Sequence, residues 1–133
     1  MYREFVVKTR LREECVSLTA LVQGVVREEG VREGWCVVYV PHTTAGVTIQ
    51  ENADPDVVED FMAGLDRMVP RNAPYQHGEG NSPAHIKASL IGSSVTVLIE
   101  EGRLLLGTWQ GIFLCEFDGP RNRRVWVKVM GIK

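Results

Sequence analysis

The three histidines of the chain are the residues that support the widest range of chemistry. His42 is expected just after a strand, His77 in a long polar loop and His85 in the first turn of a helix, and functional sites are commonly built at such element ends. Three histidines with one open coordination position form many catalytic zinc sites, so the sequence predicts a divalent metal, zinc or magnesium, bound by all three. Acid–base catalysis, substrate hydrogen bonds and structural or surface positions are the alternatives.

A second candidate is the start of the helix expected at Ser82, which carries Lys87 in its second turn. The free N–H groups and the dipole of a helix N-terminus favour an anion, and Gly78 and Gly80 would let a ligand approach the backbone closely. The pattern predicts a phosphate site at this helix. The alternative is a capped helix that binds nothing.

Polar residues also stand between the strand expected at 45–51 and the helix that follows it. Glu51, Asp54 and Asp56 supply the hard oxygen ligands that hold magnesium beside a diphosphate. Asp54 and Asp56 have a structural explanation, because an aspartate before a proline caps a helix and acidic residues suit its first turn. Glu51 and Asn52 have no such explanation and stay candidates for a site.

The fourth group is Thr108-Trp109-Gln110, which stands between Gly107 and Gly111. The flanking glycines indicate a bulge or a close approach of two backbones. Trp109 either packs as an ordinary aromatic side chain or presents its ring to a flat ligand.

Composition limits the classes of protein to which the chain can belong. Its 133 residues form one domain, 1–133, and are too few for a TIM barrel of about 250 residues. No apolar run approaches the roughly 18 residues that span a bilayer, and the net charge of −2 favours neither nucleic acid nor a membrane as a partner. We therefore expect a cytoplasmic protein, in which Cys15, Cys36 and Cys115 are reduced and buried.

The charge is unevenly distributed along the chain. Residues 42–101 hold 3 basic and 9 acidic side chains, whereas residues 102–133 hold 6 and 2. The acidic middle and the basic end can complement each other within one molecule or between subunits, or can simply face solvent.

Hydrophobic periodicity and turn residues predict the elements that position these groups. Helices are expected to begin at Thr19, Pro55 and Pro83 and to end before Gly30, Pro70 and Gly92, with N-caps at Ser17 or Thr19, at Asp54 and at Ser82. The third helix is expected to turn Ile86 and Leu90 inward. Strands are expected at 2–9, 35–40, 45–51, 95–99, 103–106, 112–117 and 125–130, with a hairpin turn at Glu101-Gly102. The result is an α+β domain with a mixed or mostly antiparallel sheet of about seven strands and about three helices.

Four stretches of the chain resemble, in order, the motifs of one protein family. They are residues 42–49 (HTTAGVTI), Glu51-Asn52 with Asp54-Pro55, residues 82–87 (SPAHIK) and residues 107–112 (GTWQGI). These motifs are similar to those of the YjbQ-type family, also called secondary thiamine-phosphate synthases, and the resemblance covers almost the whole chain. It implies a compact α+β fold and a homotrimer with polar sites near its subunit boundaries.

The resemblance also implies an activity. Some members resemble thiamine-phosphate synthase in activity, so the resemblance implies weak joining of a pyrimidine methyl diphosphate to a thiazole phosphate with release of diphosphate. The family's histidines match His42, His77 and His85, its acidic pair matches Glu51 and Asp54, its lysine matches Lys87, and its basic tail matches Arg123 and Arg124. Many members carry an acidic run before the third motif, where this chain retains only Glu79.

The residues and the resemblance together predict a weak thiamine-phosphate synthase, in which cations and hydrogen-bond donors stabilise the leaving diphosphate. The expected catalytic residues are His42, Glu51, His85 and Lys87. The expected substrate-binding residues are Thr43, Thr44, Asn52, Ser82, Thr108, Trp109, Gln110 and Arg124. The alternative is a non-enzymatic module that binds a metal ion or a phosphorylated metabolite.

Overall fold

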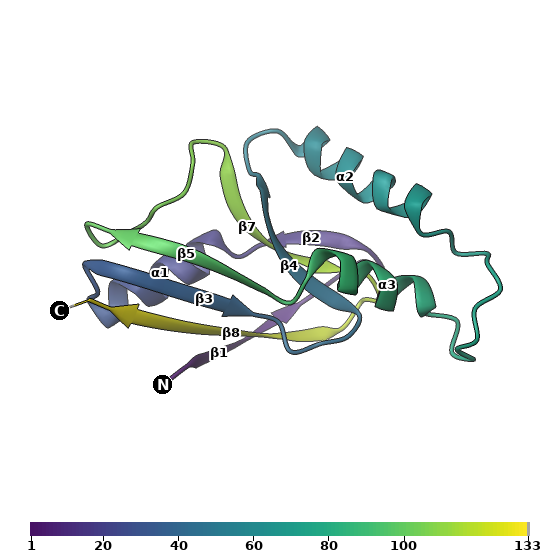
Figure 1. Ribbon diagram of the computed structural model, residues 1–133, viewed down its shortest axis with the longest axis horizontal. Helices are drawn as coiled ribbons and strands as arrows, with labels where there is room; N and C mark the ends of the chain where they lie inside the picture. Colours follow the sequence, from purple (N-terminus) through teal and green to yellow (C-terminus); the bar gives the residue numbers. More distant parts are fainter. Residues whose placement is uncertain (133) are drawn as a thin grey trace.

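Two antiparallel β-sheets form the framework of residues 1–132, the part of the chain that the computed structural model describes. The larger sheet has the strand order β1 (Arg3–Lys8), β8 (Asn122–Gly131), β3 (Glu33–Tyr39), β5 (Ser94–Glu100), β6 (Arg103–Leu104). The smaller sheet has the order β2 (Glu14–Ser17), β7 (Gln110–Glu116), β4 (Ala45–Glu51). In Figure 1, β4 and β7 run obliquely to β3, β5 and β8. The α+β class is confirmed, with eight strands and three helices in residues 1–132 where the sequence predicted about seven strands.

One hydrophobic cluster joins both sheets to α1 (Thr19–Glu29). The strands bury alternate side chains, such as Cys36 and Val38 in β3, because successive side chains of a strand point to opposite faces. Val47 of β4 comes from the smaller sheet and lies in the same cluster. In the sequence, the alternation of Val95, Val97 and Ile99 identified the core side of β5, whereas the continuous apolar run at 35–40 did not show which side of β3 faces the core.

The first helix begins at Thr19 and ends before Gly30 as predicted, but its N-cap differs. Gly30 follows α1 with φ of 66°, a left-handed conformation that glycine adopts without steric cost. The prediction of Ser17 or Thr19 as N-cap was wrong, because Leu18 holds that position and no side chain among the described residues caps it. The Thr19 hydroxyl instead accepts a hydrogen bond from the backbone N–H of Ile112, at 2.9 Å, and so ties the start of α1 to β7.

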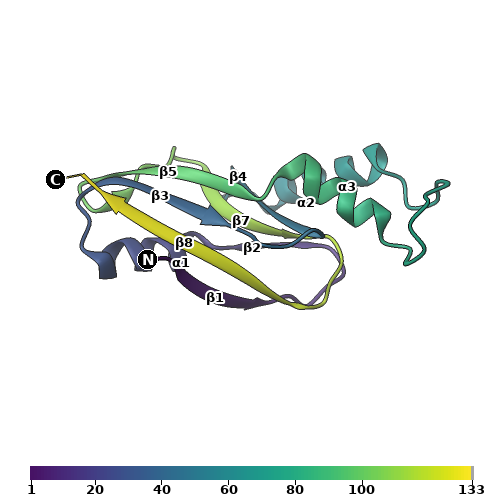
Figure 2. The ribbon, with the colours of Figure 1, turned by 60° about the horizontal axis from the view of Figure 1, so that its bottom comes forward.

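The second helix, α2 (Pro55–Met68), begins as the sequence predicted. Asp54 is the N-cap, and its Oδ1 accepts a hydrogen bond from the backbone N–H of Asp56, at 2.9 Å. Of the apolar side chains of α2, only Leu65 is fully buried, and Met68 at the end of the helix is 70% exposed. Figures 1 and 2 show α2 and α3 at one end of the molecule, joined by the long connection that was expected there.

The third helix, α3 (Ser82–Ile91), faces the core with a different side from the one predicted. Ile86 and Leu90 are 39% and 57% exposed, so the prediction that they point inward was wrong. The buried positions are Pro83, Ala84, Lys87 and Ala88. The helix is oriented by an ion-pair network at Lys87, described below. Asn81 holds the N-cap position predicted for Ser82, and no side-chain hydrogen bond within the described part of the chain caps the helix.

The remaining differences concern short elements. The hairpin turn at Glu101-Gly102 is present, with positive φ at both residues (52° and 77°), as a tight two-residue turn requires. Strand β6 is shorter than expected, and β2 was not expected at all, because four residues carry too little periodicity to identify a strand. None of the helices in residues 1–132 is long and apolar enough to cross a membrane.

Candidate functional site

Two of the three histidines, His42 and His85, line one open cavity of about 440 Å³. The cavity lies between the β3–β4 connection and α3, and its volume falls within the roughly 300–1,000 Å³ of small-molecule sites. The other lining residues are Thr43, Ala45, Ala88, Ser89, Gly92 and Ser93. Sequence reasoning missed Ser89, although it follows His85 by one helical turn and therefore lies on the same side of α3.

The close approach of two backbones shapes this cavity. The carbonyl of Gly92 accepts a hydrogen bond from the backbone N–H of Val47, at 3.0 Å, and the carbonyl of Ser93 accepts one from Val40, at 2.8 Å. A Cβ at Gly46 would lie 2.6 Å from the Gly92 carbonyl oxygen, so only glycine allows this approach. The turn after α3 is thereby held against the start of β4.

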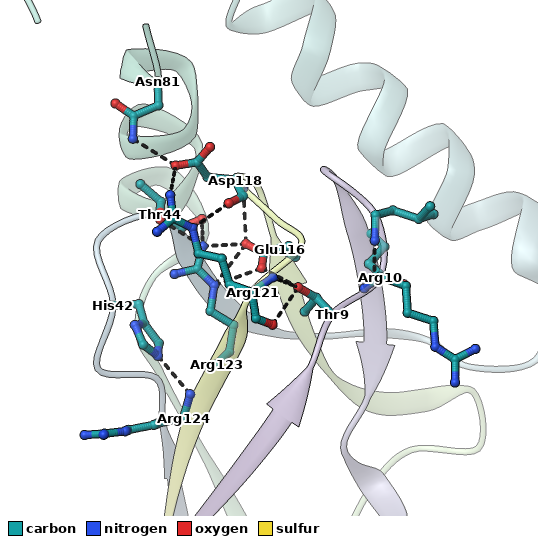
Figure 3. A network of polar contacts seen from close by, with 12 residues as sticks. Thr9, Arg10, His42, Thr44, Asn81, Glu116, Asp118, Arg121, Arg123 and Arg124 are labelled. Atoms are coloured by element: carbon teal, nitrogen blue, oxygen red, sulfur yellow. Dashed lines mark hydrogen bonds and ion pairs between the residues drawn. The ribbon is translucent and has the colours of Figure 1, made fainter. Parts of the chain in front are cut away.

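His42 is held in one tautomer by the backbone of β8. Its Nε2 accepts a hydrogen bond from the backbone N–H of Arg124, at 2.8 Å (Figure 3). Burial, and next the positive charge of Arg123, lower the pKa of His42 from its ordinary value of 6.5. The ring is therefore neutral at pH 7 and carries its proton on Nδ1, where it can donate a hydrogen bond.

His77 belongs to the same region through His85. The two rings meet edge to face with centroids 5.4 Å apart, and His77 Nε2 lies 3.6 Å from an oxygen of Glu79. Within residues 1–132, however, no three histidine, cysteine or acidic side chains are placed to hold one metal ion. His42 also uses its Nε2 lone pair for Arg124, so a single chain does not fit the predicted three-histidine metal site.

Lys87 lies on the opposite side of α3 from His85. It is 2% exposed, and its Nζ donates hydrogen bonds to Glu13, at 2.7 Å, and to Asp66 of α2. Arg71 also pairs with Glu13, at 2.6 Å. The hydrogen bond from Lys87 is the main cause that lowers the pKa of Asp66. In this chain the lysine predicted to attract phosphate binds two carboxylates outside the cavity.

The expected phosphate site at Ser82 has an acidic neighbour. The Asp118 carboxylate accepts a hydrogen bond from the side-chain amide of Asn81 and another from Arg121, each at 2.9 Å. A carboxylate beside the first turn of α3 competes with any anion for the positive end of the helix. Ser82 itself is half-buried.

A buried ion pair supports the segment that carries His42 and Thr43. Glu116 and Arg123 are 0% and 3% exposed, and Arg123 Nε donates to both Glu116 oxygens, at 2.9 and 3.0 Å. Arg123 also donates to the Thr44 hydroxyl, at 2.8 Å, and Thr9 donates to Glu116, at 2.7 Å (Figure 3). Thr44 is therefore buried and fixes the loop beside the cavity. Sequence reasoning missed this pair. The feature that could have revealed it is a single glutamate inside the apolar run 112–117.

The remaining predicted site residues gather at the other end of β4. Glu51 pairs with Gln110 across the β4–β7 ladder, and the backbone N–H of Asn52 donates to the carbonyl of Trp109, at 2.8 Å. Trp109 is 62% exposed, and Thr108 is exposed beside it. Because a strand rises about 3.4 Å per residue, Glu51 lies roughly 20 Å along β4 from the cavity end. The structure brings these residues together but not with the histidines.

Sequence comparisons extend over nearly the whole chain. The family model described as "UPF0047 protein YjbQ-like" matches residues 3–132. The chain belongs to this family. A UPF0047 protein of Methanocaldococcus jannaschii is 51% identical over 133 residues, which cover 100% of this chain and 96% of that protein. The UPF0047 protein YugU of Bacillus subtilis is 47% identical over 132 residues, with 98% and 100% covered.

Solved structures of similar proteins share the fold of this UPF0047 protein. A YjbQ/UPF0047-family protein of Clostridium acetobutylicum has a TM-score of 0.94 and 54% identity, with 96% of this chain and 99% of that chain covered. A YbjQ-like protein of Sulfolobus solfataricus also has a TM-score of 0.94, at 30% identity, with 99% and 97% covered. The predicted family and the predicted fold class are both confirmed.

The chemistry of the cavity in this YjbQ-like protein is that of a hydrogen-bond donor site. His42 presents a neutral ring with a donor Nδ1, and hydroxyl groups come from Thr43, Ser89 and Ser93. The Ser89 hydroxyl already donates its proton to the carbonyl of His85, at 2.9 Å, so it can only accept a further hydrogen bond. The donors that remain, on His42, Thr43 and Ser93, suit the oxygen atoms of a phosphate or a diphosphate.

Proposed function

We propose that this YjbQ-like protein is a weak thiamine-phosphate synthase whose cavity at His42 and His85 receives a diphosphate-bearing substrate. The observation that supports the proposal is one open cavity of about 440 Å³ lined by two histidines and three hydroxyl side chains. The reaction forms a carbon–nitrogen bond between the pyrimidine methylene carbon and the thiazole nitrogen. The carbon–oxygen bond to diphosphate breaks, and diphosphate leaves with the electron pair.

The cavity residues act on the leaving group in this proposal. Negative charge builds on the departing diphosphate, and preorganised donors stabilise charge that develops in a transition state. His42 donates from Nδ1, Thr43 and Ser93 donate from their hydroxyls, and His85 contacts the diphosphate from α3. The backbone of Arg124 binds His42, and in this proposal the Arg124 guanidinium adds positive charge to the region (Figure 3).

The proposal includes a homotrimer. In it, the cavity of one chain lies against the Glu51 end of β4 from a neighbouring chain. Glu51, Asn52, Trp109 and Gln110 lie roughly 20 Å from the histidines within one chain, so they can act on the same ligand only from a neighbouring copy. The outer face of the larger sheet provides apolar surface for such contacts, at Tyr2, Val37, Tyr39, Trp126 and Met130. We also assign the protein to the cytoplasm, where its three free thiols would persist.

Product formation by cavity variants tests the proposed synthase. His42→Ala and His85→Ala are each expected to reduce the rate from the two phosphorylated precursors by about 10- to 100-fold, because each removes a group beside the developing charge. Leu90→Ala is the matched control, since Leu90 is 57% exposed on the same helix and does not line the cavity. Unchanged rates in both histidine variants would rule out this cavity as the catalytic site.

Mixing of two impaired variants tests the shared site. His85→Ala and Trp109→Ala chains, refolded together, are expected to recover part of the activity, because some mixed trimers contain one site with both residues intact. Light scattering gives the mass of each sample. A monomeric protein, or a mixture no more active than its components, would contradict the shared site. Neither result would bear on the synthase activity, which the single-variant rates test.

A non-enzymatic binding module is the second candidate. It is favoured by the position of Lys87, which pairs with Glu13 and Asp66 outside the cavity and leaves the cavity without that cation. Thermal shifts measured with phosphate, diphosphate and the thiamine precursors, together with elemental analysis, separate the candidates. A large shift with the pyrimidine diphosphate supports the enzyme. A shift with a metal ion or phosphate alone supports the binding module.

A further inference from the structure

Cys15 and Cys115 face each other across two neighbouring strands. They are direct partners in the β2–β7 ladder, and their sulfur atoms lie 3.9 Å apart. In sequence they are 100 residues apart. The third thiol, Cys36, lies in β3 of the other sheet, opposite Val97 and Val129. The expectation of buried thiols is therefore met by Cys36 and Cys115, whereas Cys15 is half-buried.

The register of the ladder places the two cysteines at a position that suits a disulfide. The backbone N–H of Leu18 donates to the carbonyl of Ile112, at 2.7 Å, so hydrogen-bonded pairs recur at every second residue from there. The Cys15–Cys115 pair lies three residues from the hydrogen-bonded Leu18–Ile112 pair. Because three is an odd number, Cys15 and Cys115 form a non-hydrogen-bonded pair. In such pairs the Cα atoms are about 4.5 Å apart, within the roughly 4.4–6.8 Å that a disulfide spans. Side-chain rotation can then close the bond with little movement of the backbone.

The surroundings give the two sulfur atoms different roles. Cys15 is the more exposed member, and the hydrogen bond with Cys115 lowers its pKa. The same contact and burial raise the pKa of Cys115. Cys15 is thus the thiol that an oxidant in solution meets first, and the one that more readily becomes a thiolate. Burial raises the pKa of Cys36 to about 11, so this thiol also ionises less readily than Cys15.

We propose that Cys15 and Cys115 form a reversible intramolecular disulfide when the protein meets a low-molecular-weight disulfide. The Cys15 thiolate attacks one sulfur of the oxidant, forms a mixed disulfide and expels a thiolate. Cys115 then loses its proton and attacks the Cys15 sulfur, which expels the second thiol. The two cysteines lose two electrons and two protons in total, and the oxidant is reduced to two thiols.

The position of the pair determines what the disulfide would change. Both cysteines lie in the cluster that packs β2 and β7 against the helices, together with Leu65 of α2 and Ala84 and Ala88 of α3. The bond would join strands that are far apart in the chain and would therefore disfavour the unfolded state. It would also fix the surface on which α3, the helix that carries His85, is packed.

Titration with reduced and oxidised glutathione tests the proposal. After oxidation, alkylation and mass spectrometry are expected to find one free thiol per chain, Cys36, and one peptide pair joined between Cys15 and Cys115. The melting temperature is expected to rise by about 5 °C or more and to return after reduction. Cys36→Ala is the matched control and should still lose two thiols.

Two further variants link the gain in melting temperature to this one bond. Cys15→Ser and Cys115→Ala should each abolish the gain. Each variant should melt at the same temperature under oxidising and reducing conditions. Chains linked to each other through Cys15, a bond to Cys36, or three free thiols at every glutathione ratio would each overturn the proposal.

Discussion

His85 and Lys87 are two residues apart in α3 and lie on opposite sides of the helix. His85 lines the cavity with His42, whereas Lys87 is 2% exposed and binds Glu13 and Asp66. Two residues advance a helix by about 200°, so the two side chains point in nearly opposite directions. The helix therefore has one side that shapes the cavity and another that attaches it to α2 and to the β1–β2 connection.

Substitutions on the two sides of α3 should separate stability from function. Lys87→Met is expected to lower the free energy of unfolding by about 2–4 kcal/mol, because it leaves the Glu13 carboxylate, 15% exposed, without its buried cation. His85→Ala should change it by less than about 1 kcal/mol and should instead weaken ligand binding. Urea unfolding measures both. Lys8→Met, at an exposed lysine, is the control, and an equal effect of both lysine variants would contradict the role of the network.

The stability of the protein should depend on pH through His42. Its pKa in the folded state is lower than 6.5, so the unfolded chain binds the proton more tightly. The contribution of His42 is then fully present above pH 6.5 and is lost as the pH falls through the lower folded pKa. Unfolding followed between pH 5 and 8 should show this loss in the wild type and not in His42→Gln. A nitrogen-15 spectrum should show the proton on Nδ1.

Two glycines should respond to alanine in opposite directions. Gly46→Ala places a Cβ 2.6 Å from the Gly92 carbonyl oxygen and should destabilise the protein by about 1–3 kcal/mol. A Cβ at Gly24, inside α1, meets no atom of residues 1–132 within 4 Å, so Gly24→Ala should stabilise by about 0.4–1 kcal/mol. Thermal unfolding checks both signs. A neutral Gly46→Ala variant would show that β4 does not need the close approach to Gly92.

The buried pair of Glu116 and Arg123 should matter far more than an exposed pair. Glu116→Gln removes the charge opposite an arginine that is 3% exposed and should cost about 3–5 kcal/mol of stability. Glu28→Gln is the matched control, because Glu28 pairs with Arg3 at the surface and should change stability by less than about 1 kcal/mol. If the two variants unfold at the same urea concentration, the buried network does not stabilise the loop that carries Thr44.

Local signals in the sequence predicted much of the framework. Apolar alternation identified the buried faces of the central strands, since side chains of a strand alternate between two faces whatever the rest of the chain does. The Asp54-Pro55 pair identified the start of α2, because a cap and a proline at the first turn act within a few residues. The family motifs include His42, Thr43 and His85, which line the cavity, but not Ser89 or Ser93.

Only the tertiary structure decided how these parts meet. The sequence predicted Lys87 beside a phosphate, and Lys87 is instead buried because Glu13, 74 residues away in sequence, supplies a carboxylate. The short strand β2 exists because β7 pairs with it from the far end of the chain. Contacts between distant segments fix each of these outcomes, and a local pattern contains no information about them.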